Sequence, residues 1–283
     1  MAQTLHIAIF NTDIPVPEVS TTRASSYGQI FHALLSAAAT RTRPHTVIKS
    51  TEYDTRKLEY PSTLDDVDLI LITGSISSAY DDIPWVHQLE RYIVDVYRDH
   101  PQVKWFGSCF GHQIIAQALL KQYSVRVDAE PRGWEVGVKK IAMDARFRSD
   151  FAKLGFEVPE SMRMQFVHGD FVVVPDVDAL PDGWSVMGST PWCANQGMMQ
   201  EGKVLTFQGH FEFDRFVNGE TIKTFFARKA PEWLEESLKA VDADDDAELA
   251  ADMVLHFAMQ KTPAEQGRTY ERVGGLVTPP EEV

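Results

Sequence analysis

The segment KWFGSCFGHQII, residues 104–115, combines a short apolar run, a glycine-flanked cysteine and the start of a helix. A G-x-C-x-G pattern between a strand and a helix is typical of a nucleophile elbow with cysteine in place of serine. Both glycines are needed because neighbouring backbone passes close to a sharply turned residue. The following helix points its N-terminus at the sulfur, which favours the thiolate form. The segment therefore predicts that Cys109 is a nucleophile.

A chance match and a purely structural cysteine are the alternatives to this interpretation. From the glycine and cysteine frequencies of the chain, a chance G-x-C-x-G is expected roughly 0.007 times. A buried cysteine at a glycine-rich turn would need no chemistry. The other cysteine, Cys193, lies in STPWCANQ, where we expect an inert thiol in a core strand.

The elements around the elbow predict the fold class. Apolar runs with a β-branched bias indicate buried strands at residues 5–10, 46–50, 67–72 and 103–106. Helical spacing alternates with them at residues 25–39, 85–99 and 112–121, and a loop is expected at 11–22. This order predicts a three-layer α/β/α fold with a mainly parallel central sheet and helices on both faces. Further strand patterns follow at residues 136–143, 171–174, 184–187 and 204–207.

The chain divides at about residue 230. Residues 1–230 hold the predicted α/β domain, and residues 231–283 are expected to form an acidic C-terminal helical extension and tail packed on the same domain. Nine acidic residues and one lysine lie between Glu232 and Asp252. Such a run is either a solvated helix face or a surface that docks a partner.

Composition and charge argue against several classes of protein. Lys+Arg 27 against Asp+Glu 41 gives a net charge of -14, which disfavours binding to nucleic acid or to an anionic membrane surface. Two cysteines cannot form a disulfide framework or a cysteine-rich metal site. No apolar run is long enough for a membrane span, and the start lacks signal-peptide features. We expect a soluble cytoplasmic protein.

A thiolate nucleophile needs a histidine, and the histidine needs an orienting carboxylate. Of the nine histidines, His210 stands out because it follows the strand pattern VLTFQG and precedes Glu212 by two residues. Spacing of two in an extended chain puts both side chains on one side. His112 is too close to Cys109 along the chain. Without Cys109, an ordinary surface loop would be the simpler interpretation of His210 and Glu212.

Taken together, these motifs resemble the class I (triad) glutamine amidotransferases. The matching features are GSCFGHQ at the elbow, GHFEF near residue 210, TGS at residues 73–75 and HGD at residues 168–170. The resemblance covers about residues 5–215. SISSAYDDIPW and GWEVGVKKI are most similar to stand-alone members related to the amidotransferase domain of GMP synthase.

The resemblance implies roles for individual residues. Cys109 corresponds to the nucleophile, His210 to the general base and acid, and Glu212 to the orienting carboxylate. The family's oxyanion hole corresponds to the backbone N–H groups of Gly74 and Phe110. The resemblance implies that Gln113, Ser75 and His168 lie next to the substrate. The alternative for His168 and Asp170 is that they form a hydrogen-bonded pair that only shapes the loop. Trp134 is either an aromatic wall of the site or a core residue, and we favour the core. No metal ion and no organic cofactor is implied.

Two departures limit what the resemblance implies. Phe211 stands where the family usually has proline, and no ATP-pyrophosphatase domain follows residue 216. The expected activity is therefore hydrolysis or transfer of a γ-glutamyl amide, a small-molecule substrate, through a thioester. Three alternatives stay open: a glutaminase subunit that passes ammonia to a partner synthase, a thiol enzyme for a non-glutamyl acyl group, and a non-catalytic binding module.

Overall fold

The computed structural model describes residues 3–261, and its centre is a sheet of seven strands. The strand order is β2 (Thr46–Asp54), β1 (Gln3–Asn11), β3 (Leu69–Ile72), β4 (Lys104–Ser108), β12 (Val204–Phe207), β11 (Gly197–Gln200) and β9 (Trp184–Val186). The first five strands pair in parallel, and β11 and β9 add antiparallel pairs at one edge. The predicted mainly parallel sheet is confirmed.

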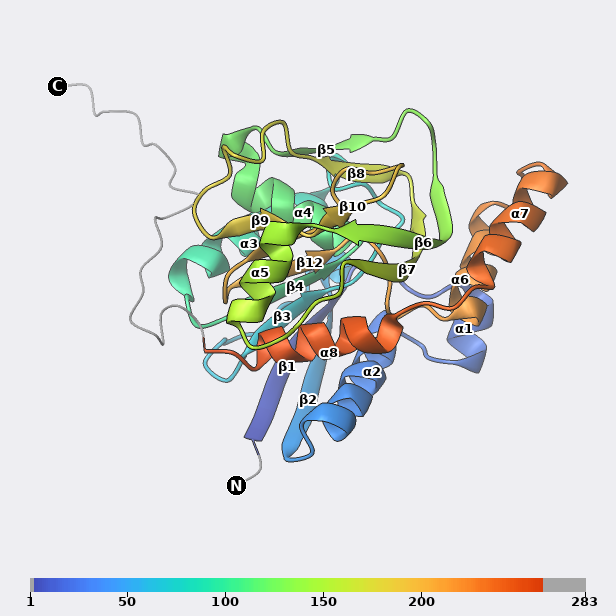
Figure 1. Cartoon of the computed structure of the whole chain (residues 1–283). Coiled ribbons are helices and arrows are strands. Elements are labelled where there is room, and N and C mark those ends of the chain that lie inside the picture. Colours follow the sequence, from blue (N-terminus) through green and yellow to red (C-terminus); the bar gives the residue numbers. More distant parts are fainter. Residues whose placement is uncertain (1–2, 262–283) are drawn as a thin grey trace.

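Helices cover both faces of this sheet (Figure 1). On one face, α2 (Tyr27–Thr42) and α8 (Ala247–Ala258) bury Phe31, Leu35 and Phe257 against Ile9 and Leu71. On the other face, α3 (Pro84–Asp99) and α4 (Phe110–Leu120) pack on the alternate side chains of the same strands. The strands are buried on both faces because successive side chains alternate between two apolar layers. The three-layer prediction is therefore confirmed.

A second layer of strands lies over the carboxyl ends of the parallel strands. β6 (Glu135–Met143) pairs with β7 (Ser161–His168) and with β10 (Gly188–Ser189), while β5 (Arg126–Ala129) pairs with β8 (Asp170–Val173). The helix α5 (Ala145–Lys153) connects β6 to β7. Because β7 ends at His168 and β8 begins at Asp170, the HGD motif is the sharp junction between these two strands.

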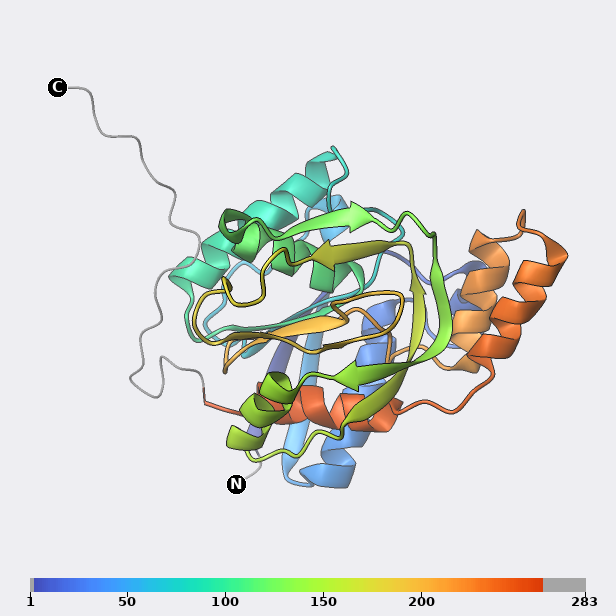
Figure 2. The same ribbon diagram turned by 45° about the horizontal axis from the view of Figure 1, so that its top comes forward.

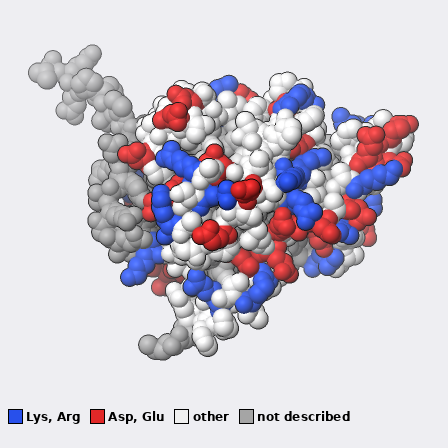
Figure 3. Space-filling model, in the orientation of Figure 1, with Lys and Arg blue, Asp and Glu red and all other residues white. Residues whose placement is uncertain are grey.

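The C-terminal segment is two helices rather than one amphipathic run. α7 (Pro231–Val241) follows α6 (Arg215–Phe225), and the two lie side by side, projecting from the end of the molecule near α1 (Figures 1 and 2). The acidic residues 242–246 form the turn into α8. In the view of Figure 3, basic and acidic side chains are interspersed, also over α7. The predicted C-terminal tail lies outside the described residues.

Two local predictions are corrected by the structure. The expected loop at 11–22 contains the short helix α1 (Pro17–Thr22), which proline can start because it lacks an N–H that would otherwise be unsatisfied. α2 begins after Ser26, whose hydroxyl accepts the Gln29 N–H at 3.2 Å, and runs to Thr42 rather than 39. Short 3-10 turns, η1 (Thr55–Lys57) and η2 (Lys121–Tyr123), follow β2 and α4. Within residues 3–261, no helix is long and apolar enough to cross a membrane.

Candidate active site

Cys109 lies at the junction of β4 and α4, in the sharply turned backbone that the G-x-C-x-G pattern predicted. Its φ of 50 and ψ of -106 fall in a region that non-glycine residues rarely adopt. A Cβ on Gly107 would lie 2.4 Å from the backbone of Gly111, and one on Gly111 would lie 2.3 Å from the Ile72 carbonyl oxygen. Glycine is therefore required on both sides of the cysteine for the turn to close.

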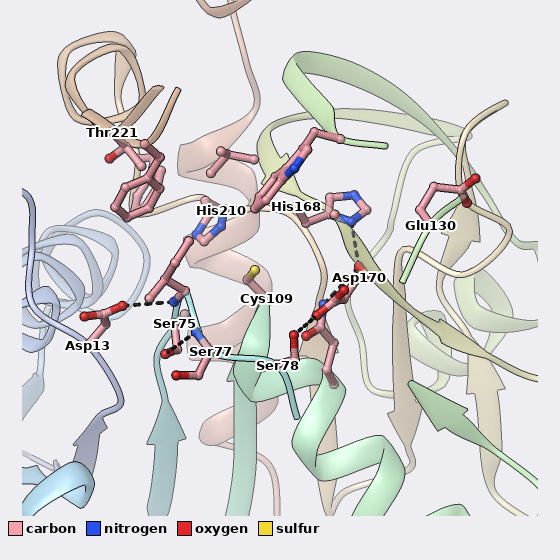
Figure 4. A pocket seen from close by; sticks show the side chains of 18 of the residues that line it. Asp13, Ser75, Ser77, Ser78, Cys109, Glu130, His168, Asp170, His210 and Thr221 are labelled. Carbon is pink, nitrogen blue, oxygen red and sulfur yellow. Dashed lines mark hydrogen bonds between the residues drawn. The ribbon is translucent and has the colours of Figure 1, made fainter. Parts of the chain in front are cut away.

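His210 and Glu212 follow β12, the neighbour of β4, and this brings them beside Cys109 (Figure 4). The His210 Nδ1–H donates to Glu212 Oε1 at 2.7 Å, so the two-residue spacing places both groups together as expected. Ser108 donates its hydroxyl to the same carboxylate at 3.0 Å. All three side chains are buried. Nε2 of His210 is the ring atom left for the thiol, since it has no other hydrogen bond in the described part of the chain.

The electrostatic surroundings favour a charged imidazolium beside the thiol. Burial alone lowers the pKa of His210, but the charges of Glu212 and Cys109 and the hydrogen bonds from both outweigh it and raise that pKa to about 10. Cys109 is followed directly by the N-terminus of α4, whose dipole favours a negative charge. The arrangement is suited to a thiolate–imidazolium pair.

Two aromatic side chains that the sequence did not indicate hold the His210 ring. Phe213 stacks on it with ring centroids 4.0 Å apart and an interplanar angle of 12°, and Tyr27 stacks on Phe213 at 5.6 Å. Phe211, which replaces the usual proline, points the other way into the core. There it makes edge contacts with Phe31 and Phe106, which anchor the loop between the two functional side chains.

The backbone N–H groups of Gly74 and Phe110 are both available to a ligand. Neither donates to a protein acceptor within residues 3–261. The Thr12 hydroxyl lies 2.9 Å from the Gly74 carbonyl oxygen and holds this turn in place. Gly74 must also be small, because a Cβ there would lie 3.0 Å from the His210 ring and 3.5 Å from Cβ of Cys109.

The cavity in front of Cys109 has a volume of about 300 Å³ and includes the predicted substrate neighbours. Ser75 lines it, with Oγ accepting the Ser77 N–H at 3.1 Å. Gln113 also lines it and donates through Nε2 to the Asp170 carbonyl oxygen at 3.0 Å. The Asp170 carboxylate accepts hydrogen bonds from Ser78 at 2.5 Å and from Tyr80 at 3.0 Å. Figure 4 shows Asp170 and Glu130 on the side of the cavity opposite His210.

His168 borders the cavity but is tied on both ring nitrogens. Nδ1 faces the Asp170 carbonyl oxygen at 2.9 Å, and Nε2 faces the Glu135 carboxylate at 2.9 Å. Glu135, which sequence reasoning missed, also accepts from Thr190 and Gln196, each at 2.7 Å. Burial raises the pKa of Glu135, but these hydrogen bonds and the His168 charge outweigh it and lower that pKa. His168 therefore shapes the junction of β7 and β8 as well as lining the site.

The remaining predictions have mixed outcomes. Trp134, for which the core was favoured over a wall of the site, is partly exposed; it packs against a buried hydrophobic cluster and also lines the cavity. Cys193 is buried as expected, although it lies in a turn between β10 and β11 and not in a strand. Burial raises the pKa of the Cys193 thiol to about 12. In the described ranges, no group of three His, Cys, Asp or Glu side chains could hold a metal ion.

Comparisons with known proteins identify the family of this chain. The family model "Glutamine amidotransferase class-I" matches residues 24–229. A glutamine amidotransferase-like protein of Schizosaccharomyces pombe is 30% identical over 261 residues, which is 90% of this chain and 99% of the relative. Gamma-glutamyl peptidase 3 of Arabidopsis thaliana is 27% identical over 184 residues, covering 61% of this chain and 69% of that protein.

A GMP synthase of Burkholderia mallei is 27% identical over 179 residues, which is 58% of this chain but 29% of that longer protein. The crystal structure of a glutamine amidotransferase from Thermotoga maritima has the same fold, with a TM-score of 0.60 and 17% identity over 90% of this chain and 99% of that one. The family match spans most of the chain, including the elbow and the His210 loop. The chain therefore belongs to the class I glutamine amidotransferase family.

Proposed function

We propose that this protein hydrolyses γ-glutamyl amides through a thioester on Cys109. The observation that carries the proposal is the strained elbow that presents Cys109 beside the buried His210–Glu212 pair, with the His210 pKa raised to about 10. The similarity to gamma-glutamyl peptidases of Arabidopsis supports a γ-glutamyl substrate. The cavity volume of about 300 Å³ suits a small molecule, and the net charge of -14 argues against a nucleic-acid substrate.

In the first half-reaction, the Cys109 thiolate attacks the γ-carbonyl carbon and forms a C–S bond. The carbonyl oxygen becomes an oxyanion that accepts hydrogen bonds from the free N–H groups of Gly74 and Phe110. When this intermediate collapses, the C–N bond breaks, and the His210 imidazolium gives its Nε2 proton to the departing amine. Removing one oxyanion donor typically costs about 2.7–4 kcal/mol of transition-state stabilisation.

In the second half-reaction, water attacks the thioester carbonyl. The neutral His210 takes a proton from that water, the C–S bond breaks, and glutamate leaves. The thiolate and the imidazolium are thereby restored. Glu212 keeps Nδ1 protonated throughout and so leaves Nε2 as the atom that exchanges protons.

The cavity wall opposite His210 supports binding of the glutamyl head group. Asp170 presents a carboxylate there, and Gln113 and His168 fix its backbone through its carbonyl oxygen. An α-amino group is a cation, so the Asp170 carboxylate is its natural partner. Ser75 follows β3 at the carboxyl edge of the sheet, where α/β proteins bind their ligands, and its hydroxyl faces the same cavity.

The test is glutamate release from glutamine, γ-glutamyl anilide and γ-glutamyl peptides by the wild type and by Cys109→Ala. We expect release by the wild type and its complete loss in the variant, with Cys193→Ala as the matched control that keeps activity. Selective alkylation of Cys109 without any release would refute the γ-glutamyl substrate and favour another acyl donor. Weak release from glutamine that rises on adding a synthase partner would instead favour an ammonia-supplying subunit. Absence of both release and selective alkylation would refute catalysis by Cys109.

A further inference from the structure

Glu135 on β6 has a buried carboxylate that the proposed mechanism does not use. Glu135 does not line the cavity of Cys109, whereas its partner His168 does. Three donors converge on the carboxylate: the His168 ring at 2.9 Å, and the Thr190 hydroxyl and the Gln196 amide, each at 2.7 Å. Because a buried charge is costly unless it is paired and hydrogen-bonded, these partners are what stabilises the carboxylate inside the protein.

His168 needs a hydrogen on both ring nitrogens to satisfy its two partners. Nε2 faces the Glu135 carboxylate and Nδ1 faces the Asp170 carbonyl oxygen, each at 2.9 Å (Figure 4 shows the second contact). Both partners can only accept, whereas a neutral imidazole has a single N–H. The ring that makes both hydrogen bonds is therefore an imidazolium with Glu135 as its counter-ion. Glu135 and His168 are direct partners in the β6–β7 ladder, which places both side chains on one face.

The other ionisable groups around the ring do not supply a second counter-ion. His112 of α4 is fully buried, and burial followed by the charge of His168 lowers its pKa to about 3, so it is neutral. The carboxylate of Glu130 is held by Arg132, whose hydrogen bond is the main cause that lowers the Glu130 pKa. The Asp170 carboxylate accepts from two hydroxyl groups of the loop after β3.

Two donors meet on the carbonyl oxygen of Asp170. The His168 ring reaches it from β7, and the Gln113 amide reaches it from α4 at 3.0 Å. Asp170 begins β8 at the sharp junction with β7, and its carboxylate lies on the cavity wall opposite His210 (Figure 4). The two donors therefore fix the backbone from which this carboxylate extends into the site.

A second path of hydrogen bonds closes a ring through Glu135. Gln196 donates from its side chain to Glu135 and accepts the Gln208 N–H on its backbone carbonyl oxygen at 2.9 Å. The side chain of Gln208 in turn accepts the Gln113 amide at 3.1 Å. Gln208 precedes His210 by two residues, so the ring joins the wall that carries Asp170 to the chain that carries the base. Glu135 is the charged acceptor at which both paths meet.

We propose that Glu135 is a positioning residue for the wall of the site that binds the glutamyl head group. Its charge keeps both ring nitrogens of His168 protonated, and the ring then holds the Asp170 backbone. The Asp170 carboxylate thereby stays where it can accept the α-amino group of the substrate. This role in substrate binding rests on the proposed γ-glutamyl hydrolysis, whereas the protonation of His168 can be measured without substrate.

The protonation of His168 is measured by nitrogen NMR of protein with isotope-labelled histidine, at neutral pH and without substrate. We expect two ring N–H groups for His168 in the wild type, assigned by their loss in His168→Gln. Glu135→Gln keeps the shape of the side chain but removes its charge, so His168 should become neutral with one ring N–H. Asp150→Asn, at another buried carboxylate on α5, is the matched control and should leave both hydrogens in place.

The effect on binding is measured as KM and kcat with γ-glutamyl anilide. For Glu135→Gln we expect KM to rise by about 10- to 100-fold, the loss typical of one hydrogen bond to a charged group. The value of kcat should fall by less than about threefold, because the interaction is the same before and in the transition state. Alkylation of Cys109 by iodoacetamide should keep its wild-type rate. Glu135→Asp retains the charge and should show a smaller rise in KM and two ring hydrogens on His168.

A single ring hydrogen on His168 in the wild type would overturn the inference, and this result needs no active enzyme. An unchanged KM in Glu135→Gln, or equal losses of kcat and of Cys109 alkylation, would indicate a merely structural role and overturn the inference alone. A wild type that cleaves no γ-glutamyl substrate would overturn the proposed function and the role of Glu135 in substrate binding with it. If Glu135→Gln does not fold, the wild-type spectrum and Glu135→Asp decide the outcome.

Discussion

The Glu212 carboxylate lies between two donors, the His210 ring and the Ser108 hydroxyl, so its orientation is fixed from both sides. Its charge also contributes to the raised pKa of His210. The same residue therefore sets both the direction of the ring and its protonation. Replacing the carboxylate by an amide separates these two effects, because the amide oxygen can still accept from Nδ1 while the charge is lost.

We expect Glu212→Gln to lower kcat/KM by about 100- to 10,000-fold at pH 8. The loss of charge should also lower the pKa of His210 from about 10. The measurement is kcat/KM against pH, together with the pH dependence of Cys109 alkylation. Glu160→Gln, at a side chain that is 88% exposed, is the matched control. An active variant with an unchanged alkylation profile would contradict this role of Glu212.

The direction of the pKa shift of His210 determines how the stability and the activity of the wild type depend on pH. Its folded pKa of about 10 lies above the usual value of 6.5, so the protonated ring stabilises the fold fully below pH 6.5, and this stabilisation is lost as the pH rises through 10. Departure of the amine needs the same proton. We therefore expect kcat/KM of the wild type to fall above about pH 10. In Glu212→Gln this fall should begin at a lower pH. If kcat/KM of the wild type instead fell above about pH 6.5, this result would contradict the ion pair between His210 and Glu212.

At the elbow, the backbones of β3, β4 and α4 lie so close together that only glycine fits at the points of contact. A methyl group on Gly111 would lie 2.3 Å from the Ile72 carbonyl oxygen, and neither backbone segment can move without disturbing the sheet. We expect Gly111→Ala to reduce the free energy of unfolding by about 1–3 kcal/mol, as overpacking does in other cores, and to impair catalysis. Urea unfolding followed by circular dichroism measures the change.

Gly219 supplies the comparison for this prediction. It lies inside α6, and a Cβ there would lie 3.8 Å from Cδ2 of Leu238, an ordinary contact. Gly219→Ala should therefore be neutral or stabilise the fold by up to about 1 kcal/mol, because alanine is the better helix former. If both substitutions changed the free energy of unfolding equally, the close approach of Gly111 to the Ile72 carbonyl oxygen would not be what makes Gly111→Ala destabilising.

α8 and α2 together cover one face of the central sheet. Met253, Val254, Leu255 and Phe257 are fully buried, and the buried Lys104 ammonium donates to the Phe257 and Ala258 carbonyl oxygens at 3.0 Å at the helix end. We expect Phe257→Ala to destabilise the fold by about 3–5 kcal/mol in urea unfolding. Glu248→Ala, at a side chain that is 84% exposed on the same helix, should have little effect. A small loss for Phe257→Ala would mean that the core closes without α8.

The elements that the sequence predicted correctly have local signals. Cys109 stands between two glycines, and the strands around it are continuous apolar runs, so the elbow and the parallel sheet could be predicted without tertiary information. The helix α1 was missed because its six residues are polar at most positions. The sequence predicted that the C-terminal helical segment packs on the domain, but not that α8 is part of the core, because the acidic residues before it dominated the pattern.

The site shows the same division between local and distant signals. His210 and Glu212 are two residues apart, and their spacing alone brought them together. Glu135 and His168 are 33 residues apart and meet only through the pairing of β6 and β7. Phe213 and Trp134 are single aromatic residues whose contacts depend on how α6 and the second strand layer fold over the sheet. The role of Phe213 could not be predicted from the sequence, and for Trp134 the wall of the site was only the alternative to the core.

The whole molecule contains two thiols in opposite surroundings. Both thiols are buried, but Cys109 lines the cavity, whereas burial raises the pKa of Cys193 to about 12. We expect the native protein to react rapidly with one equivalent of a small disulfide reagent and the unfolded protein with two. The count is made from the absorbance of the released thiol, and Cys109→Ala should give none in the native state. Rapid reaction of both thiols in the native wild type would contradict the assignment of Cys193 as inert.

The strand order has a consequence for synthesis of the protein. Cys109, the proposed nucleophile, follows β4, and His210, its proposed base, follows β12. These neighbouring strands are separated by 95 residues along the chain, between Ser108 and Val204. A nascent chain emerging from the ribosome thus exposes Cys109 well before the segment that carries His210 has been translated. Until β12 pairs with β4, Cys109 lacks the histidine that we propose as its base, so we expect no acylation of the nascent chain by substrate. The two halves of the candidate site therefore come together only when β12 has paired with β4.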